Sequence, residues 1–217
     1  MRPKHLAMAL SKLVPHPQTD VNLEQYATEG DLAAYWMMAV DQLDHVEGKT
    51  VADLGAGNGI LGIACLLLGA ERVVFVECHQ ATLEALRSNL ASLDQDFQSK
   101  AEVVEARVGV DEVALDGVEV VVMNPPWGVQ QGKADRPFLE AALGSEATAV
   151  HLLHSDHATH LEAFGHHLGW AVETVMRTEF RLPATYAHHQ QRKGAADVQC
   201  LRFHREGDAR LATEDDV

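Results

Sequence analysis

The sequence has few cysteines and no long apolar run. Cys65, Cys78 and Cys200 are odd in number and far apart, so neither a disulfide framework nor a cysteine-rich metal site is expected. Cys65 falls in an apolar helical stretch and Cys200 in an apolar strand, which predicts buried thiols. No apolar run is long enough to span a bilayer, and the N-terminal residues do not resemble a signal peptide. We therefore expect a folded protein of a reducing, cytoplasmic compartment.

Positive charge is also scarce. Lys and Arg number 17 against 32 Asp and Glu, so the net charge is −15. Such acidity disfavours contact with the phosphates of a nucleic acid over most of the surface. Residues 177–205 are an exception that predicts either a phosphate-binding region or an ordinary solvated surface. This stretch contains two acidic residues, Glu179 and Asp197, and six basic ones, namely Arg177, Arg181, Arg192, Lys193, Arg202 and Arg205.

The length of 217 residues suits one domain with a sizeable core. Neither an internal repeat nor a linker divides the chain. We expect a single domain over residues 1–205, with a short N-terminal extension over 1–22. Residues 206–217 carry five acidic residues and one arginine, which predicts a disordered tail.

Apolar runs alternate with segments of helical periodicity along the domain. Strands are predicted over 50–54, 72–77, about 101–107, 118–123, 148–153, 170–181 and 196–205. Helices are predicted over about 5–13, 29–46, 59–69, 80–93, 136–143 and 156–168. Repeated strand–helix units that end in a pair of strands predict an α/β fold. We expect a doubly wound, mainly parallel seven-stranded sheet with one antiparallel strand.

A glycine-rich turn follows the first predicted strand. Asp53 precedes the turn, in which Gly55, Gly57 and Gly59 alternate with other residues. Glycines permit a tight turn and let the backbone approach a ligand closely. Glu77 ends the next predicted strand, 22 residues after Gly55, a spacing that suits a carboxylate binding ribose hydroxyls. An acidic residue before such glycines is typical of S-adenosylmethionine sites.

The sequence Asn124-Pro125-Pro126-Trp127 follows the apolar run 118–123. The two prolines stop the strand from continuing or turning directly into a helix, so a stiff, extended loop is expected. The Asn124 amide oxygen and the Pro125 carbonyl could accept hydrogen bonds from a planar NH2 group while Trp127 stacks on it. A nucleobase amine or a carboxamide fits this description. The alternative is a proline-stiffened loop with a packed tryptophan.

Together these motifs resemble the class I S-adenosylmethionine-dependent methyltransferases. Within them the chain is similar to the ribosomal RNA adenine-N6 methyltransferases of the methyltransferase-like protein five type and their archaeal relatives. The likeness extends from about residue 5 to 205. The stretches that carry it are 23–28 (LEQYAT, for LEQYPT), 53–59, 124–128 (NPPWG, for NPPFG) and 180–186 with 188–193. The first and the last of these are not general methyltransferase features.

The resemblance implies S-adenosylmethionine as the cofactor. Gln25 and Thr28 would contact it from the N-terminal side. Relatives commonly place an acidic residue where Arg107 stands, so either Arg107 stacks on the cofactor's adenine or the Val108 backbone contacts it. The residues implied to line the cofactor site are Gln25, Thr28, Asp53, Gly55, Gly57, Asn58, Ile60, Glu77, Arg107 and Val108. The residues implied to contact RNA are Arg181, His188, His189, Arg192 and Lys193.

The implied reaction is in-line methyl transfer to N6 of an extruded adenine in structured RNA, above all small-subunit ribosomal RNA. Asn124, Pro125, Pro126 and Trp127 would hold that base. Two other functions stay open: glutamine-N5 methylation of a release factor, and a non-catalytic binding subunit of the same fold. Relatives also work with a small zinc-binding activator protein, which the resemblance implies here.

Four histidines recur at every third position, namely His151, His154, His157 and His160. This spacing raises the possibility of a metal site. The run spans a predicted strand end and helix start, however, so one shared face is not ensured. Solvated or supporting roles are expected, with no resident metal.

Overall fold

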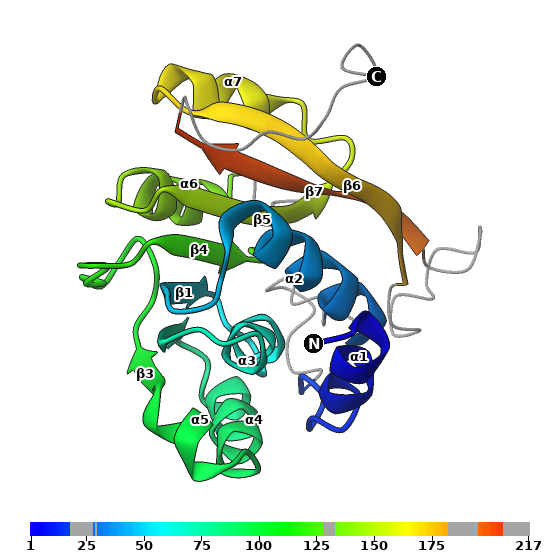
Figure 1. Cartoon of the computed structure of the whole chain (residues 1–217). Coiled ribbons are helices and arrows are strands. Elements are labelled where there is room, and N and C mark those ends of the chain that lie inside the picture. The colour runs from blue at the N-terminus through cyan, green and yellow to red at the C-terminus, as the bar shows by residue number, and fades with distance from the viewer. Residues whose placement is uncertain (18–27, 29, 128–132, 182–194, 206–217) are drawn as a thin grey trace.

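The computed structural model describes residues 1–17, 28, 30–127, 133–181 and 195–205, and it describes the backbone alone at 180, 181 and 195. Within these residues a central sheet is covered by helices on both faces (Figure 1). The seven strands lie in the order β3-β2-β1-β4-β5-β7-β6. Their bounds are β1 Thr50–Leu54, β2 Arg72–Glu77, β3 Ala101–Glu105, β4 Val120–Met123, β5 Ala149–Ser155, β6 Ala171–Arg181 and β7 Ala195–His204.

The pairing of the strands confirms the predicted fold class. Strands β3, β2, β1, β4 and β5 pair in parallel, and β7 is antiparallel to both of its neighbours, β5 and β6. The sheet is therefore mainly parallel, with β7 as its one antiparallel strand among the described strands. Since β1 stands between β2 and β4, the chain winds outward from it in both directions, and loops from several strands meet at their carboxyl ends.

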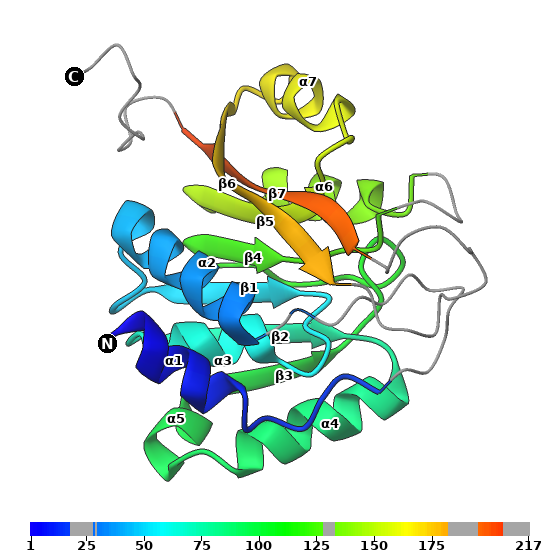
Figure 2. The ribbon, with the colours of Figure 1, turned by 90° about the vertical axis from the view of Figure 1, so that its right-hand side faces the viewer.

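Helices cover the two faces unequally. Their bounds are α1 Pro3–Leu10, α2 Gly30–Asp44, α3 Ile60–Leu67, α4 Gln80–Ala91, α5 Gln95–Ser99, α6 Arg136–Leu143 and α7 His160–His167. Residues of α1, α2, α3 and α4 share one core with one face of the strands, and residues of α6 and α7 share a second core with the other face (Figure 2). None of the helices in the described residues is long and apolar enough to cross a membrane.

The strands are buried on both faces, as a parallel sheet between two helix layers requires. Along β4, Val120 and Val122 belong to the first core, whereas Val121 and Met123 belong to the second. This explains why the strand is a continuous apolar run rather than an alternating one. Cys65 and Cys200 are buried as predicted, and Cys78 is exposed; all three are free thiols.

Some details of the predicted elements differ from the structure. The short helix α5 was not predicted, and α7 begins at His160 rather than at 156 because residues 156–159 form turns. Strand β3 ends at Glu105, not at 107. Beyond it the Arg107 nitrogen donates to Asp111 Oδ2 at 2.7 Å, and the Arg107 carbonyl accepts from Val110 and Asp111, which closes a turn.

The expectation of a basic surface over 177–205 is wrong for Arg202. Its side chain is fully buried and donates to both carboxylate oxygens of Asp44, at 2.9 and 2.5 Å, and to Glu173 at 2.7 Å. His151 Nε2 lies 2.7 Å from the same Asp44 carboxylate. Removing a guanidinium from water costs free energy unless nearby groups compensate its charge. The two carboxylates therefore make the burial of Arg202 possible. Arg177 pairs with Asp156 at the surface.

Candidate active site

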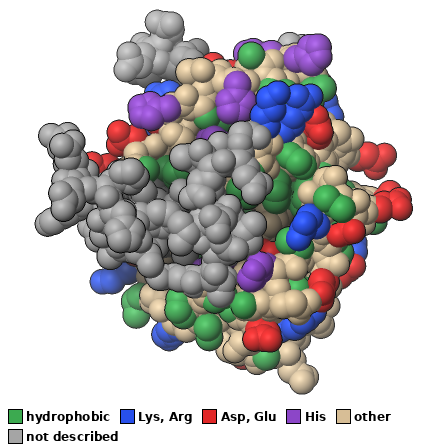
Figure 3. Space-filling model, turned by 180° about the vertical axis from the view of Figure 1, so that it is seen from behind, with side chains coloured by type: hydrophobic (Ala, Val, Ile, Leu, Met, Phe, Trp, Pro, Cys, Tyr) green, Lys and Arg blue, Asp and Glu red, His purple; other side chains and the backbone are tan. Residues whose placement is uncertain are grey.

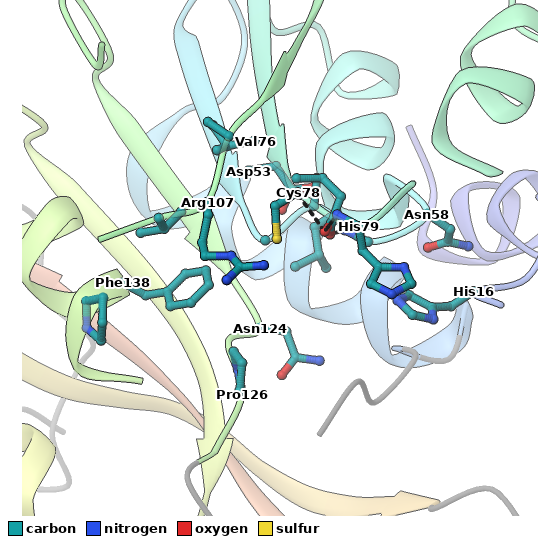
Figure 4. A pocket seen from close by; sticks show the side chains of 18 of the residues that line it. His16, Asp53, Asn58, Val76, Cys78, His79, Arg107, Asn124, Pro126 and Phe138 are labelled. Carbon is teal, nitrogen blue, oxygen red and sulfur yellow. Dashed lines mark hydrogen bonds between the residues drawn. The ribbon is translucent and has the colours of Figure 1, made fainter. Parts of the chain in front are cut away.

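A cavity of about 500 Å³ opens at the carboxyl ends of β1, β2 and β4. Figure 4 shows side chains from these strand ends around it, with His16 from the segment after α1 and Phe138 from α6. The predicted site residues that line it are Thr28, Asp53, Gly55, Gly57, Asn58, Ile60, Glu77, Arg107, Val108, Asn124 and Pro126. The topology thus brings the glycine turn, the ribose-binding candidate and the Asn124 loop to one place.

The remaining predicted residues do not line the cavity or cannot be placed. Pro125 and Trp127 are buried and are not among the cavity's lining residues. Gln25, His188, His189, Arg192 and Lys193 lie outside the described residues, as does the side chain of Arg181.

The glycine turn depends on left-handed backbone at three positions. Gly55, Gly57 and Gly59 have φ angles of 71°, 58° and 86°. A Cβ at Gly59 would lie 2.4 Å from Leu86 Cδ1, so the leucine side chain would have to move. The left-handed backbone and the close packing both favour glycine at position 59.

Asp53 brings a poorly compensated carboxylate to the cavity. Its Oδ2 accepts a hydrogen bond from the Gly62 nitrogen at 2.8 Å, while its buried Oδ1 has no partner among the described residues. Burial raises the pKa of Asp53 to about 7; the Gly62 hydrogen bond opposes the shift and the charge of Glu77 adds to it. A buried oxygen of this kind suits a ligand that brings a cationic donor, such as an α-ammonium group.

Glu77 joins the end of β2 to the glycine turn. Its Oε1 accepts from the nitrogens of Cys78 and His79, at 2.8 and 2.9 Å, and its Oε2 accepts from Gly57 nitrogen at 3.0 Å. Each carboxylate oxygen has two lone pairs, so Oε2 keeps capacity for a hydroxyl donor. The carboxylate is thereby fixed in position before any ribose arrives.

Asn58 makes a contact that the sequence did not predict. Its Nδ2 donates to the Val14 carbonyl at 2.9 Å. Asn89 of α4 also binds Val14: its Oδ1 accepts from the Val14 nitrogen at 2.7 Å, and its Nδ2 donates to the Val14 carbonyl at 3.1 Å. These amides fix the segment after α1 beside the glycine turn. His16, in that segment, lines the cavity next to Gly57, and burial lowers its pKa. No local motif signals a contact between residues 75 positions apart.

Asn124 projects into the cavity from the end of β4, opposite the glycine turn (Figure 4). Its Nδ2 donates to Thr28 Oγ1 at 3.2 Å, and its Oδ1 accepts from Trp127 Nε1 at 3.3 Å. An indole nitrogen can only donate, so this bond specifies which end of the amide is oxygen.

Trp127 does not line the cavity, so its stacking on a bound base stays a prediction. The side chain is 8% exposed, belongs to the core on the α1–α4 side and lies with its ring 6.0 Å from that of His154. Its indole nitrogen donates to the Asn124 amide oxygen and so holds that side chain. Among the described residues, Phe138 on α6 brings a phenyl ring to the cavity lining, which sequence reasoning missed.

Arg107 stands in the turn after β3 with its side chain exposed at the cavity edge (Figure 4). Val108 is buried beside it and also lines the cavity. The two alternatives for the adenine contact, Arg107 stacking and the Val108 backbone, thus lie on the same wall.

The four regularly spaced histidines do not share a face. His151 contacts Asp44, His154 and His160 contact Asp135, and His157 is exposed. In Figure 3 several histidine side chains lie at the α7 end of the molecule, apart from one another. Within the described residues, no group of three or more His, Cys, Asp or Glu could hold a metal ion.

Comparison with known proteins agrees with this geometry. The family model described as the methyltransferase small domain matches residues 31–156, a span that includes the glycine turn, Glu77 and the Asn124 loop. The chain belongs to the methyltransferase small domain family. It is a class I methyltransferase that uses S-adenosylmethionine, and the glycine turn, the Asp53 Oδ1 and the Glu77 carboxylate fit that cofactor.

Three relatives resemble the methyltransferase over nearly its whole length. The rRNA N(6)-adenosine-methyltransferase METTL5 of Danio rerio is 26% identical and covers 94% of this chain and 99% of its own. The rRNA N(6)-adenosine-methyltransferase Mettl5 of Drosophila melanogaster is 30% identical and covers 86% and 88%. A crystal structure from Pyrococcus horikoshii, of a candidate RNA methyltransferase, is 34% identical with a TM-score of 0.81 and covers 97% and 99%.

Proposed function

We propose that this enzyme methylates N6 of an adenine in structured RNA, with small-subunit ribosomal RNA as its substrate. The observation that carries the proposal is the position of Asn124. Its carboxamide lines the same cavity as the Gly55–Gly59 turn and Glu77, so an amine held by Asn124 would lie beside the cofactor. The names of the zebrafish and fruit-fly relatives, which are rRNA N6-adenosine methyltransferases, support adenine in RNA over other acceptors.

The residues of the chain position the acceptor. The cofactor, when bound, supplies a methyl group already activated on a sulfonium. Asn124 Oδ1 accepts one hydrogen of the adenine amine. Pro125 is buried, but it stands in the chain between the cavity-lining residues Asn124 and Pro126, and its backbone carbonyl accepts the other hydrogen. Both bonds withdraw the hydrogens from the line of attack and turn the nitrogen lone pair toward the methyl group. Thr28 and Trp127 keep the Asn124 amide in this orientation.

No strong base is required of the protein, because the amine nitrogen becomes acidic once it carries the methyl group. The proton then leaves to solvent. An adenine in a helix has its N6 engaged in pairing, so the target must be unpaired or extruded from its stack to reach Asn124. Trp127 would stack on the base, and Phe138 is a further ring among the described cavity residues that a flat group could contact.

Two further parts of the proposal rest on the family resemblance. Arg181, His188, His189, Arg192 and Lys193 would contact RNA phosphates, which would offset the acidic charge of the rest of the chain. A small zinc-binding activator protein would cover an apolar edge of the methyltransferase. Strand β3 ends the described sheet on one side, and a bare edge strand exposes unpaired backbone groups.

One experiment tests the acceptor directly. The full-length protein is incubated with labelled S-adenosylmethionine in three separate reactions, which contain total RNA, isolated small subunits or total protein. RNA that takes up label is then digested to nucleosides. The proposal expects label in N6-methyladenosine from small-subunit RNA. Label in a protein fraction, as glutamine-N5 methylation would give, or no transfer despite cofactor binding would contradict it. Repeating the assay with a co-purified partner tests the activator.

A further inference from the structure

A buried aspartate lies next to the cavity without lining it. Asp135 is the residue before α6 and is 3% exposed. His160 Nε2 lies 2.9 Å from its Oδ2, and His154 Nε2 lies 3.3 Å from the same oxygen. His154 comes from β5 and His160 begins α7, so one carboxylate joins three elements of the second core.

This cluster continues to the proposed acceptor site. The His154 ring is tilted by 31° against the Trp127 indole, with 6.0 Å between ring centroids. Trp127 Nε1 in turn donates to Asn124 Oδ1 at 3.3 Å. Asn124 is therefore connected through Trp127 and His154 to Asp135 by one direct contact at each step.

Asp135 is also tied to the opposite wall of the cavity. Its neighbours Ala134, Pro137 and Phe138 line the cavity, and the Asp135 carbonyl accepts from the nitrogens of Phe138 and Leu139, at 3.1 Å each. Its side chain makes no cap bond to α6. The carboxylate thus acts on β5 and α7, while the same residue's backbone begins the helix that carries Phe138.

The charges in the cluster favour an ionised Asp135. Burial alone would raise the pKa of Asp135, but the interactions with His154 and His160 outweigh it and lower that pKa from its ordinary value. His154 is only 2% exposed, and no hydrogen bond of standard geometry reaches its ring nitrogens from the described residues. The nearby carboxylate is what compensates the burial of this imidazole.

We infer that Asp135 and His154 are positioning residues for methyl transfer. Together they fix the Trp127 indole, and through it the orientation of the Asn124 carboxamide, relative to the α6 wall. His160 supports Asp135 from the surface, where its side chain is 59% exposed. The inference rests on the proposed role of Asn124, and it assigns no substrate contact to the cluster.

Two conservative variants test this. Asp135→Asn keeps the shape but removes the charge, and His154→Phe keeps a ring against Trp127 but removes the contact with Asp135. Both should lower kcat by about tenfold to a hundredfold, the size of effect that a displaced catalytic group produces. The KM for the acceptor and the calorimetric Kd for S-adenosylmethionine should each stay within about twofold, because the cluster contacts neither ligand. His160→Gln should give a smaller loss in the same direction.

A spectroscopic signal separates positioning from general stability. The chain has three tryptophans, so its indole N–H groups give three NMR signals, of which Trp127→Phe identifies one. Asp135→Asn should shift the Trp127 signal and leave those of Trp36 and Trp170 in place. His157→Gln is the matched control: His157 is exposed in the same segment and lies outside the cluster, and this variant should behave as wild type in every measurement.

Wild-type kcat in Asp135→Asn and His154→Phe would overturn the inference. An unchanged Trp127 NMR signal in Asp135→Asn would also overturn it. So would a fall in kcat that comes with a similar fold-loss of cofactor affinity and a clearly lower melting temperature, because that pattern indicates general destabilisation. The assays use whichever acceptor fraction takes up label from the wild-type enzyme. A wrong substrate assignment therefore appears in the labelling experiment, and a wrong positioning assignment appears only in the comparison of variants.

Discussion

Asn124 Nδ2 donates a hydrogen bond to Thr28 Oγ1 at 3.2 Å, although the two residues are 96 positions apart in the chain. Thr28 belongs to the segment before α2, and Asn124 follows β4. The contact joins the N-terminal segment to the end of β4 at the cavity, which both residues line. It also suggests that the N-terminal segment takes part in orienting the acceptor amide.

We predict that Asn124→Ala abolishes detectable methyl transfer while cofactor binding persists. The alanine has no amide to hold the acceptor amine, whereas the glycine turn and Glu77 are untouched. Thr28→Val, which keeps the shape but removes the hydroxyl, should lower kcat by about tenfold, the value of one orienting hydrogen bond. Single-turnover assays with calorimetry check both. Full turnover by Asn124→Ala would refute the proposed mechanism.

Cofactor affinity should depend on pH through Asp53. With a pKa of about 7, Asp53 is mostly protonated at pH 6 and mostly ionised at pH 8. If its carboxylate binds the cofactor's ammonium group, affinity should rise by about tenfold between these pH values. Calorimetric titration at both pH values measures this. The dependence should disappear in Asp53→Asn, and a flat wild-type profile would rule out the ammonium contact.

The same residue should affect stability in the opposite sense. The unfolded chain loses the Asp53 proton near its ordinary pKa of 3.8, whereas the folded protein keeps it until pH is about 7. Between these values the unfolded state binds fewer protons, so this residue's contribution to stability falls as pH rises. Asp53→Asn should therefore stabilise the protein at pH 8. The gain should be up to about 4 kcal/mol, because the pKa of Asp53 differs by about three units between the folded and unfolded states. Chemical denaturation at pH 5 and pH 8 compares the two proteins, and an equal difference at both would be inconsistent with the linkage.

Gly59→Ala should strongly destabilise the fold. The residue has a φ of 86°, and the added Cβ would meet Leu86 Cδ1 at 2.4 Å. Strained backbone and overpacking together should cost about 3 kcal/mol or more. Gly117→Ala is the matched control, since its φ is 70° but nothing lies within 4 Å of the added atom, and it should cost about 1 kcal/mol. Urea unfolding of both variants measures the difference; equal losses would mean that Leu86 simply moves aside.

Removing one partner of the buried Asp44–Arg202 pair should destabilise the protein by about 3–5 kcal/mol, because the other charge is left uncompensated. Burial alone would raise the pKa of Asp44, but His151 and Arg202 lower it well below its ordinary value. A depressed pKa stabilises the fold above the unfolded value of 3.8, and this contribution disappears as pH falls toward the folded value. Asp44→Asn should thus lose most stability near neutral pH and less in acid. The double variant Asp44→Leu with Arg202→Met should recover part of the loss in urea unfolding. A double variant as unstable as the sum of the single ones would show that the pair is not coupled.

Local sequence patterns determined the fold class, the sheet and most of the cavity. Apolar runs such as 118–123 define buried strands by composition alone, and Gly55, Gly57 and Gly59 specify a turn that other residues adopt only at a cost. Because parallel strands align their carboxyl ends, Asp53, Glu77 and Asn124 had to converge once the sheet formed.

The tertiary structure alone decided which of these side chains face the cavity. The motif predicts a Trp127 ring exposed for stacking, but in the structure Trp127 packs against His154 and belongs to the core shared with α1–α4. Arg202 reads as part of a basic surface, yet Asp44, 158 positions away, makes its burial possible. Sequence gives each residue's chemistry and local geometry, whereas burial and partnership arise from contacts between distant segments, which local patterns do not encode.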